Sequence, residues 1–87
     1  MLDNCQKILQ AHKEIAHQRG DDKTYCPSEV AKKVFGSNWR EHMQDVRKVA
    51  DRLVTENKLK ILQKGEVLRC LPTEAKGPIR LQRSGET

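Results

Sequence analysis

The stretch that decides the fold is VRKVADRLVTENKLKILQKGEVLRC, residues 46–70. In its first half the apolar residues recur every three or four positions, which is typical of an amphipathic helix, whereas its second half alternates apolar and polar residues, which is typical of strands. The change of period falls near residue 58. We therefore expect a helix that leads directly into a two-stranded hairpin.

The hairpin is expected to turn at Lys64-Gly65, since a short pair containing glycine between two alternating segments favours a tight turn. Lys60 and Arg69 would then share the outer face, opposite an apolar inner face. The expected cross-strand pairs are Gln63 with Glu66, Ile61 with Leu68, and Leu59 with Cys70.

A first helix is predicted over residues 5–19, where apolar residues follow helical spacing. Asp3 or Asn4 can cap its start, and Gly20 can adopt the left-handed conformation that ends a helix. A turn at Asp21-Asp22-Lys23 and a short extended piece at 24–26 follow.

A second helix is predicted to begin at Pro27, since proline fits the first turn, and to end at Phe35-Gly36. Ser37 or Asn38 is expected to cap a third helix with Glu41 closing a capping box, and Asn57 is expected to end it. The apolar stripe assigned to this third helix comprises Trp39, Met43, Val46, Val49, Ala50, Leu53 and Val54. Trp39, Val46 and Leu53 are predicted to lie in the core.

This order of elements predicts a mainly α fold with a small β-hairpin, a winged helix-turn-helix of three helices plus a wing. Residues 1–83 would form one domain and residues 84–87 a frayed tail. Residues 79–83 alternate, and they could lie on the sheet or on the helices.

Several blocks of the chain resemble a bacterial family of small winged-helix-like proteins that is catalogued as a domain of unknown function. The two most specific blocks are Cys26-Pro-Ser-Glu-Val-Ala31 and Gly77-Pro-Ile-Arg-Leu81. The others are Thr24, Trp39-Arg40, Met43, Val46-Arg47 and Gln63-Lys64-Gly65. The resemblance covers the chain from the first helix to Leu81 and implies the fold, but it implies no activity.

Length and composition limit the class of protein. With 87 residues the chain makes one domain, and it contains no apolar run long enough to cross a membrane and no signal-peptide pattern at its start. Cys5, Cys26 and Cys70 are odd in number and far apart, which indicates buried, reduced thiols in a cytoplasmic protein rather than a disulfide framework or a zinc site. No metal and no cofactor are expected.

Positive charge is concentrated in the second part of the chain. Residues 1–30 hold 4 basic and 5 acidic residues, a net charge of −1, whereas residues 31–87 hold 13 basic and 7 acidic residues, a net charge of +6. A polyanion would therefore bind to the second part.

We interpret this pattern as duplex-DNA binding by a transcriptional or nucleoid-associated accessory factor, with the third helix in the major groove and the wing on the backbone. The candidate DNA-binding residues are Arg40, Gln44, Arg47, Lys48, Arg52, Lys60, Lys64 and Arg69. Neutralisation of five or six phosphates would give a log–log salt slope of about −4.5 to −5.5. The alternative is a protein-interaction module that keeps the fold without binding DNA, because Glu41, Asp45 and Asp51 offset the bases of the helix. Single-stranded RNA is less favoured, since exposed aromatic residues are few.

Catalysis has little support in the sequence. His12, His17 and His42 lack sequence-local partners that would tune them as bases, so each is interpreted as a surface or boundary residue. Cys26 and Ser28 are likewise interpreted as structural, and no small-molecule substrate is indicated. Arg47 or Arg80 is expected to form an ion pair with Glu29 that locks the helices to the last strand; a ligand or backbone contact is the alternative.

Overall fold

The computed structural model describes residues 3–20 and 22–84. Met1, Leu2, Asp21 of the predicted turn, and residues 85–87 of the predicted tail lie outside the described residues. The elements in chain order are α1 (Asn4–Arg19), β1 (Thr24–Tyr25), α2 (Pro27–Phe35), the 3-10 helix η1 (Gly36–His42), α3 (Met43–Thr55), β2 (Leu59–Gln63), β3 (Glu66–Leu68) and β4 (Arg80–Arg83). The fold is mainly helical, as the sequence predicts, and over the described residues the predicted hairpin is part of a small four-stranded antiparallel sheet.

The limits of α1 follow from its caps. The Asp3 carboxylate accepts a hydrogen bond from the Gln6 N–H at 2.8 Å, which satisfies one of the free donors of the first turn. Gly20 has a φ of 79° and donates its N–H to the Ala16 carbonyl, which ends the helix. Both predicted caps are confirmed.

The connection from α2 to α3 differs from the prediction. No extended residue separates them, because η1 joins α2 directly to α3, and the cap expected at Ser37 or Asn38 does not exist. The ring of Phe35, the last residue of α2, stacks on the ring of His42, the last residue of η1, with the centroids 3.6 Å apart, which holds the tighter 3-10 turns between them in place. Residues 36–42 also look helical in the sequence, and periodicity alone does not separate a 3-10 helix from an α-helix.

Trp39 lies on η1 and is only half-buried, so its predicted place in the core is corrected. Its ring packs against the core from outside. Two cations flank the ring, with Lys32 Nζ at 4.7 Å and Arg40 Cζ at 4.9 Å from the centroid. This cation–π arrangement explains why an aromatic residue sits near the surface.

Helix α3 supplies the centre of the core and ends at Thr55, with Glu56 rather than the predicted Asn57 as its C-cap. Its buried residues are Val46, Val49, Ala50 and Leu53. Asn57 adopts a φ of 63°, and the Lys58 N–H donates to the Leu53 carbonyl at 2.9 Å. These features make a Schellman-type end, in which asparagine takes the position usually held by glycine.

The sheet has the order β1-β4-β2-β3, and each neighbouring pair is antiparallel. The predicted pairs Gln63 with Glu66 and Ile61 with Leu68 are confirmed. Because β3 ends at Leu68, the predicted pairing of Leu59 with Cys70 is not part of the ladder. On the other edge of β2, Leu59 pairs with Arg83 of β4.

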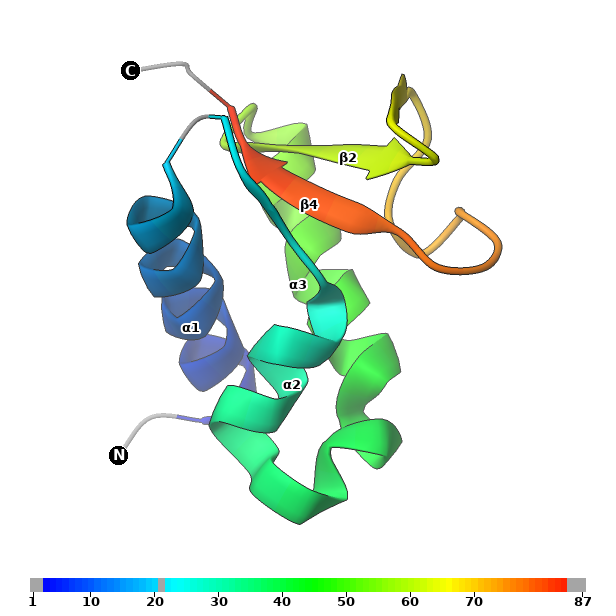
Figure 1. Ribbon diagram of the computed structural model, residues 1–87. Helices are drawn as coiled ribbons and strands as arrows, with labels where there is room; N and C mark the ends of the chain where they lie inside the picture. The colour runs from blue at the N-terminus through cyan, green and yellow to red at the C-terminus, as the bar shows by residue number, and fades with distance from the viewer. Residues whose placement is uncertain (1–2, 21, 85–87) are drawn as a thin grey trace.

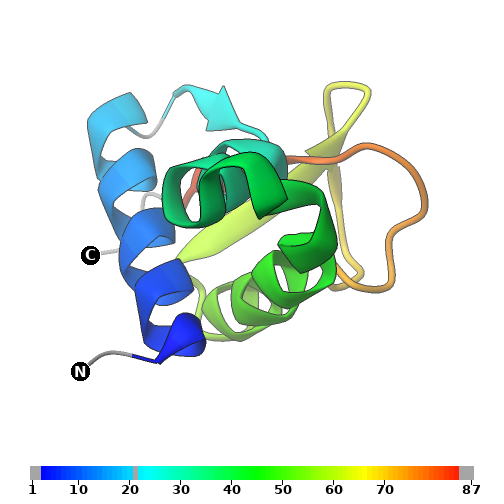
Figure 2. The same cartoon turned by 90° about the horizontal axis from the view of Figure 1, so that it is seen from below.

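Strand β4 crosses the middle of the sheet, between β1 and β2, which resolves the alternatives left open for residues 79–83. Figure 1 shows β4 and β2 in front of α3, so the sheet and α3 form two adjacent layers, and Figure 2 shows α1 at one end of the molecule and the hairpin with its following loop at the other. Ile61 and Leu81 are buried between these layers. The other face of the sheet therefore points away from α3.

His12 is fully buried, contrary to the prediction of a surface or boundary residue. Its Nε2 lies 3.1 Å from the Val46 carbonyl and its Nδ1 lies 3.0 Å from the Tyr25 hydroxyl. A carbonyl only accepts, so Nε2 donates to Val46 and the Tyr25 hydroxyl donates to Nδ1. Burial lowers the pKa of His12 to about 4, although the hydrogen bond to Val46 acts in the opposite direction. His12 therefore links α1, β1 and α3 as a neutral imidazole.

The three cysteines carry free thiols, but they are less buried than predicted. Cys5 is exposed, because it lies in the first turn of α1 before that helix meets the core, and Cys26 and Cys70 are half-buried. Cys70 packs against the core, as its place on the inner face predicts. Over the described residues, no helix has the length and apolar character needed to cross a membrane.

Candidate nucleic-acid interface

Helix α3 presents a polar ridge on the side opposite its buried residues. Because Val46, Ala50 and Leu53 face the core, the helical period directs the intervening positions outward. The outward ridge is formed by the exposed residues Gln44, Lys48, Arg52 and Thr55, and Asp45, which is also exposed, lies beside it. The ridge thus combines an amide with two cations, next to one carboxylate.

Asp51 of α3 and Glu56, which directly follows α3, make local contacts. The Asp51 carboxylate accepts hydrogen bonds from the Thr73 N–H at 3.0 Å and from the Thr73 hydroxyl at 2.6 Å. Glu56 forms ion pairs with Lys58 and Arg52. The hydrogen bond from Lys58, and after it the one from Arg52, holds the pKa of Glu56 below its ordinary value. Asp45 lies 3.5 Å from the His42 imidazole, and Glu41 is exposed. The fold therefore gives Asp51 hydrogen-bond partners but does not remove the negative charge that counts against DNA binding in the sequence.

Arg47 fastens the loop of residues 71–78 to α3. Its Nη1 donates to the carbonyls of Pro72 at 3.4 Å and Ala75 at 3.2 Å, and its Nη2 donates to the carbonyl of Gly77 at 3.0 Å. The N–H groups of the Arg47 guanidinium therefore donate to backbone carbonyls. This backbone contact is the stated alternative to an ion pair with Glu29. Arg47 is a structural residue rather than one available to DNA.

Gln63 fixes the same loop from the hairpin side. Its Nε2 donates to the carbonyls of Lys76 at 2.6 Å and Pro78 at 3.2 Å. Inside the loop the Glu74 carboxylate accepts the Leu71 N–H at 2.8 Å. Side chains from α3 and from β2 therefore hold this loop in one position, with Lys76 exposed on it.

The hairpin tip carries a cation in an unusual backbone conformation. Lys64 has a φ of 54° and Gly65 a φ of 84°, so both central residues are left-handed, as a type I′ turn requires. Asparagine or glycine fits the first of these positions with less strain than lysine does. Lys64 is exposed.

The structure divides the predicted basic face into two. Leu59 and Ile61 point into the core, so Lys60 between them lies on the sheet face that points away from α3. Arg69 lies between Leu68 and Cys70, which both pack against the core, and belongs to the same outer face. Lys60 and Arg69 therefore do not join the ridge of α3.

Arg40 lies near the start of α3 but on η1. It is exposed, and its guanidinium covers one side of the Trp39 ring. Of the eight predicted DNA-binding residues, Gln44, Lys48 and Arg52 thus share the α3 ridge, and Lys64 projects at the hairpin tip.

The amino-acid sequence matches one known protein family over most of its length. The family described as "Protein of unknown function (DUF3253)" matches residues 5–84. The chain belongs to this family. Its description assigns no activity, and no curated protein matches the chain.

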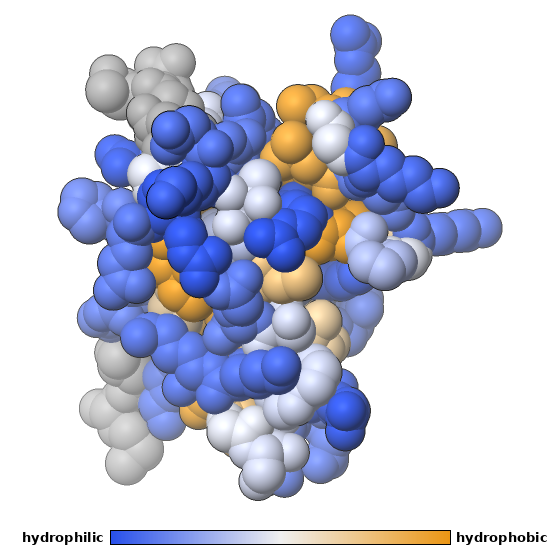
Figure 3. Space-filling model, in the orientation of Figure 1, coloured by the Kyte–Doolittle hydropathy of each residue, from blue (hydrophilic) through white to orange (hydrophobic). Residues whose placement is uncertain are grey.

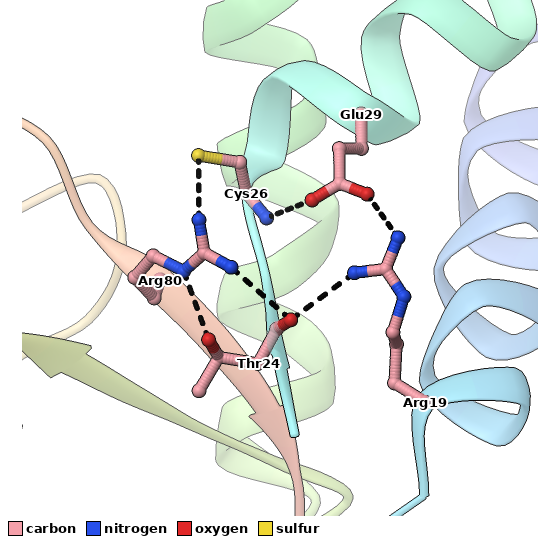
Figure 4. Close-up of polar contacts among 5 residues, drawn as sticks. All are labelled: Arg19, Thr24, Cys26, Glu29 and Arg80. Carbon is pink, nitrogen blue, oxygen red and sulfur yellow. Dashed lines mark hydrogen bonds and ion pairs between the residues drawn. The ribbon is translucent and has the colours of Figure 1, made fainter.

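The two blocks that carry the resemblance of this DUF3253 member to its family meet in space. Figure 4 shows Arg80, from the second block, reaching Cys26 at the start of the first. Arg80 donates to the Thr24 hydroxyl at 2.9 Å and to the Thr24 carbonyl at 3.2 Å, and its Nη1 lies 3.7 Å from the Cys26 Sγ. These contacts fasten β4 to β1 and to the start of α2.

The predicted partner of Glu29 is corrected. Glu29 pairs with Arg19 of α1, not with Arg47 or Arg80, and its other oxygen accepts the Cys26 N–H at 2.9 Å. Burial acts to raise the pKa of Glu29, but hydrogen bonds from Arg19 and Cys26 and the charges of Arg19 and Arg80 outweigh it, so the pKa lies below its ordinary value. The cluster connects α1, β1, α2 and β4, which accounts structurally for these blocks.

Sequence reasoning missed Lys76 and the loop contacts of Asp51 and Gln63. The sequence contains no signal for them, since their partners are backbone carbonyls and a threonine far along the chain. Over residues 3–20 and 22–84, no three His, Cys, Asp or Glu side chains gather closely enough to hold a metal ion.

Proposed function

We propose that this protein is a winged-helix domain that binds duplex DNA, with the ridge of α3 in the major groove and the hairpin with its following loop as the wing. Two features support the winged-helix assignment. The helical run α2–η1–α3 precedes the hairpin, and β4 returns between β1 and β2 after the long β3-to-β4 connection. DNA-binding domains of this type place the second motif helix in the groove.

The observation that carries the proposal is the attachment of the wing loop to α3 by Arg47. Three carbonyls of the loop converge on one guanidinium, and Asp51 adds two contacts through Thr73. A groove-binding helix and a backbone-binding loop must keep a fixed geometry to bind one duplex together. This clamp supplies that geometry.

The hairpin tip gives independent support. A lysine in a left-handed turn position costs backbone free energy that asparagine would largely avoid. Backbone strain of this kind concentrates at functional sites. The charge of Lys64 at the end of the wing is a reason for lysine to occupy the position.

In the proposed mechanism, cations position the domain and one amide reads sequence. Lys48 and Arg52 on α3, and Lys64 and Lys76 on the wing, contact phosphates. Gln44 can form two hydrogen bonds with the N6 and N7 edge of adenine in the major groove. The mechanism includes no catalytic step.

A mobility-shift titration of a random duplex tests the proposal. Lys64→Glu should weaken binding to every sequence alike, whereas Gln44→Ala should chiefly change the preference among sequences. Lys60→Glu is the matched control, because it changes the net charge equally but on the other face of the sheet. Equal losses for Lys60→Glu and Lys64→Glu, or no detectable binding at low salt, would contradict the proposed interface.

The alternative function, a protein-interaction module, is favoured by one feature of the outer sheet face. Val67 is 56% exposed there, next to the cations Lys60 and Arg69. Figure 3 shows hydrophobic atoms exposed in the region of the hairpin among hydrophilic ones. A single exposed valine is common on protein surfaces, so DNA binding remains our first proposal.

A further inference from the structure

A cavity of about 300 Å³ lies where α1, the end of α3, β2 and β4 meet. The side chains at its floor are buried: His12, Ala16, Leu53 and Leu59. The side chains at its rim are exposed or half-exposed: Lys13, His17, Lys58, Arg83 and Ser84. It thus has a mostly apolar floor and a basic rim, and its volume is at the lower end of ligand-binding pockets.

Local structure explains how the rim forms. Lys13 and His17 are four residues apart on α1, so they lie on the same side of the helix. The left-handed turn at Asn57 reverses the chain and places Lys58 directly before β2. Arg83 is brought opposite by its pairing with Leu59, and the Ser84 N–H donates to the Lys58 carbonyl at 3.0 Å.

The charged side chains that line the cavity are all basic. Among the described residues, its lining includes lysines, an arginine and histidines but no Asp or Glu. Glu56, outside the lining, lies 3.3 Å from Lys58 of the rim. A concave site lined by one sign of charge attracts and concentrates counter-ions of the opposite sign.

We propose that this cavity binds a small organic anion, with its carboxylate or phosphate group at the basic rim and its apolar body on the floor. A cation cluster alone would suit any anion. The buried Ala16, Leu53 and Leu59 favour an anion with an apolar part. The site is separate from the outward ridge of α3, so the inference does not depend on DNA binding.

Titration of the ¹⁵N-labelled protein by NMR, at constant ionic strength, tests the inference. Sodium hexanoate and sodium acetate are the probes. Saturable shifts of the Ala16, Leu59 and Ser84 amides are expected with hexanoate. Its Kd should be at least tenfold lower than that of acetate, because each buried methylene contributes about fourfold. Equal affinity of the two probes, or shifts that do not saturate, would overturn the proposal.

Two variants distinguish the cavity from general attraction of anions to a basic protein. Lys13→Gln should weaken hexanoate binding about fivefold, as expected for loss of one partly solvated charge. Lys7→Gln removes the same charge from an exposed position on α1 that does not line the cavity, and it should leave the Kd within twofold. If both variants weaken binding equally, the cavity is not the binding site.

Discussion

Acidification should unfold this domain through one buried imidazole, His12. In the folded protein its pKa is about 4, against 6.5 for an exposed histidine. The folded state therefore binds fewer protons than the unfolded state, so the stability from neutral His12 is present above pH 6.5 and is lost as the pH falls from 6.5 towards 4. With about 1.4 kcal/mol per tenfold difference in proton affinity, the full loss is about 3 kcal/mol, and about 2 kcal/mol is lost between pH 7 and pH 5.

Urea denaturation followed by far-UV circular dichroism at pH 7 and pH 5 measures this loss. Glu29 and Glu56 have lowered pKa values, so the stability that they contribute is lost at lower pH, below about 4.5, and the window from 7 to 5 belongs to His12. His12→Gln, which keeps a donor and an acceptor but does not titrate, is the control. It should be less stable at pH 7 and nearly independent of pH in this window. Wild-type protein equally stable at pH 7 and 5 would refute the reasoning.

Three further changes test other parts of the structure. Lys64→Asn should raise stability by about 0.5 kcal/mol, because asparagine suits the left-handed turn position, and should at the same time weaken duplex binding in a mobility shift. Arg47→Ala should cost about 2 kcal/mol in urea denaturation through its lost carbonyl contacts, and hydrogen exchange at the Ala75 amide should become faster. Burial, reinforced by the charge of Glu29, raises the pKa of Tyr25, so stability should fall as the pH rises above about 10, the ordinary value. Since Tyr25 is the single tyrosine, tyrosinate absorbance should appear only with unfolding.

The features predicted correctly from the sequence are those with local signals. The change of period near residue 58 gave the end of α3 and the hairpin, and alternation gave the pairing of Ile61 with Leu68. Caps at Asp3 and Gly20 are local as well. The helix start at Met43 was missed, because residues of a 3-10 helix and an α-helix are similar over so short a stretch.

The candidate site and the buried His12 were harder to predict because their contacts are long-range. His12 finds Tyr25 at a separation of 13 residues and Val46 at 34. Arg47 binds carbonyls 25 to 30 residues away, and a carbonyl has no sequence signature. The alternation of the strand predicted that Lys60 lies on the outer face of the hairpin. The sequence did not predict which face of the sheet α3 covers.

The central claim is that the ridge of α3 and the clamped wing bind duplex DNA together. Its most direct test is the fluorescence anisotropy of a labelled random duplex, titrated with the protein over a range of salt concentrations. Phosphate contacts by Lys48, Arg52, Lys64 and Lys76 predict a log–log slope of about −3.6, shallower than expected from the sequence, since Arg47, Lys60 and Arg69 do not take part. In Lys64→Gln the magnitude of the slope should fall by the contribution of about one phosphate contact, and in Lys60→Gln it should stay unchanged. Absence of binding at low salt, or a slope that changes with Lys60→Gln and not with Lys64→Gln, would contradict it.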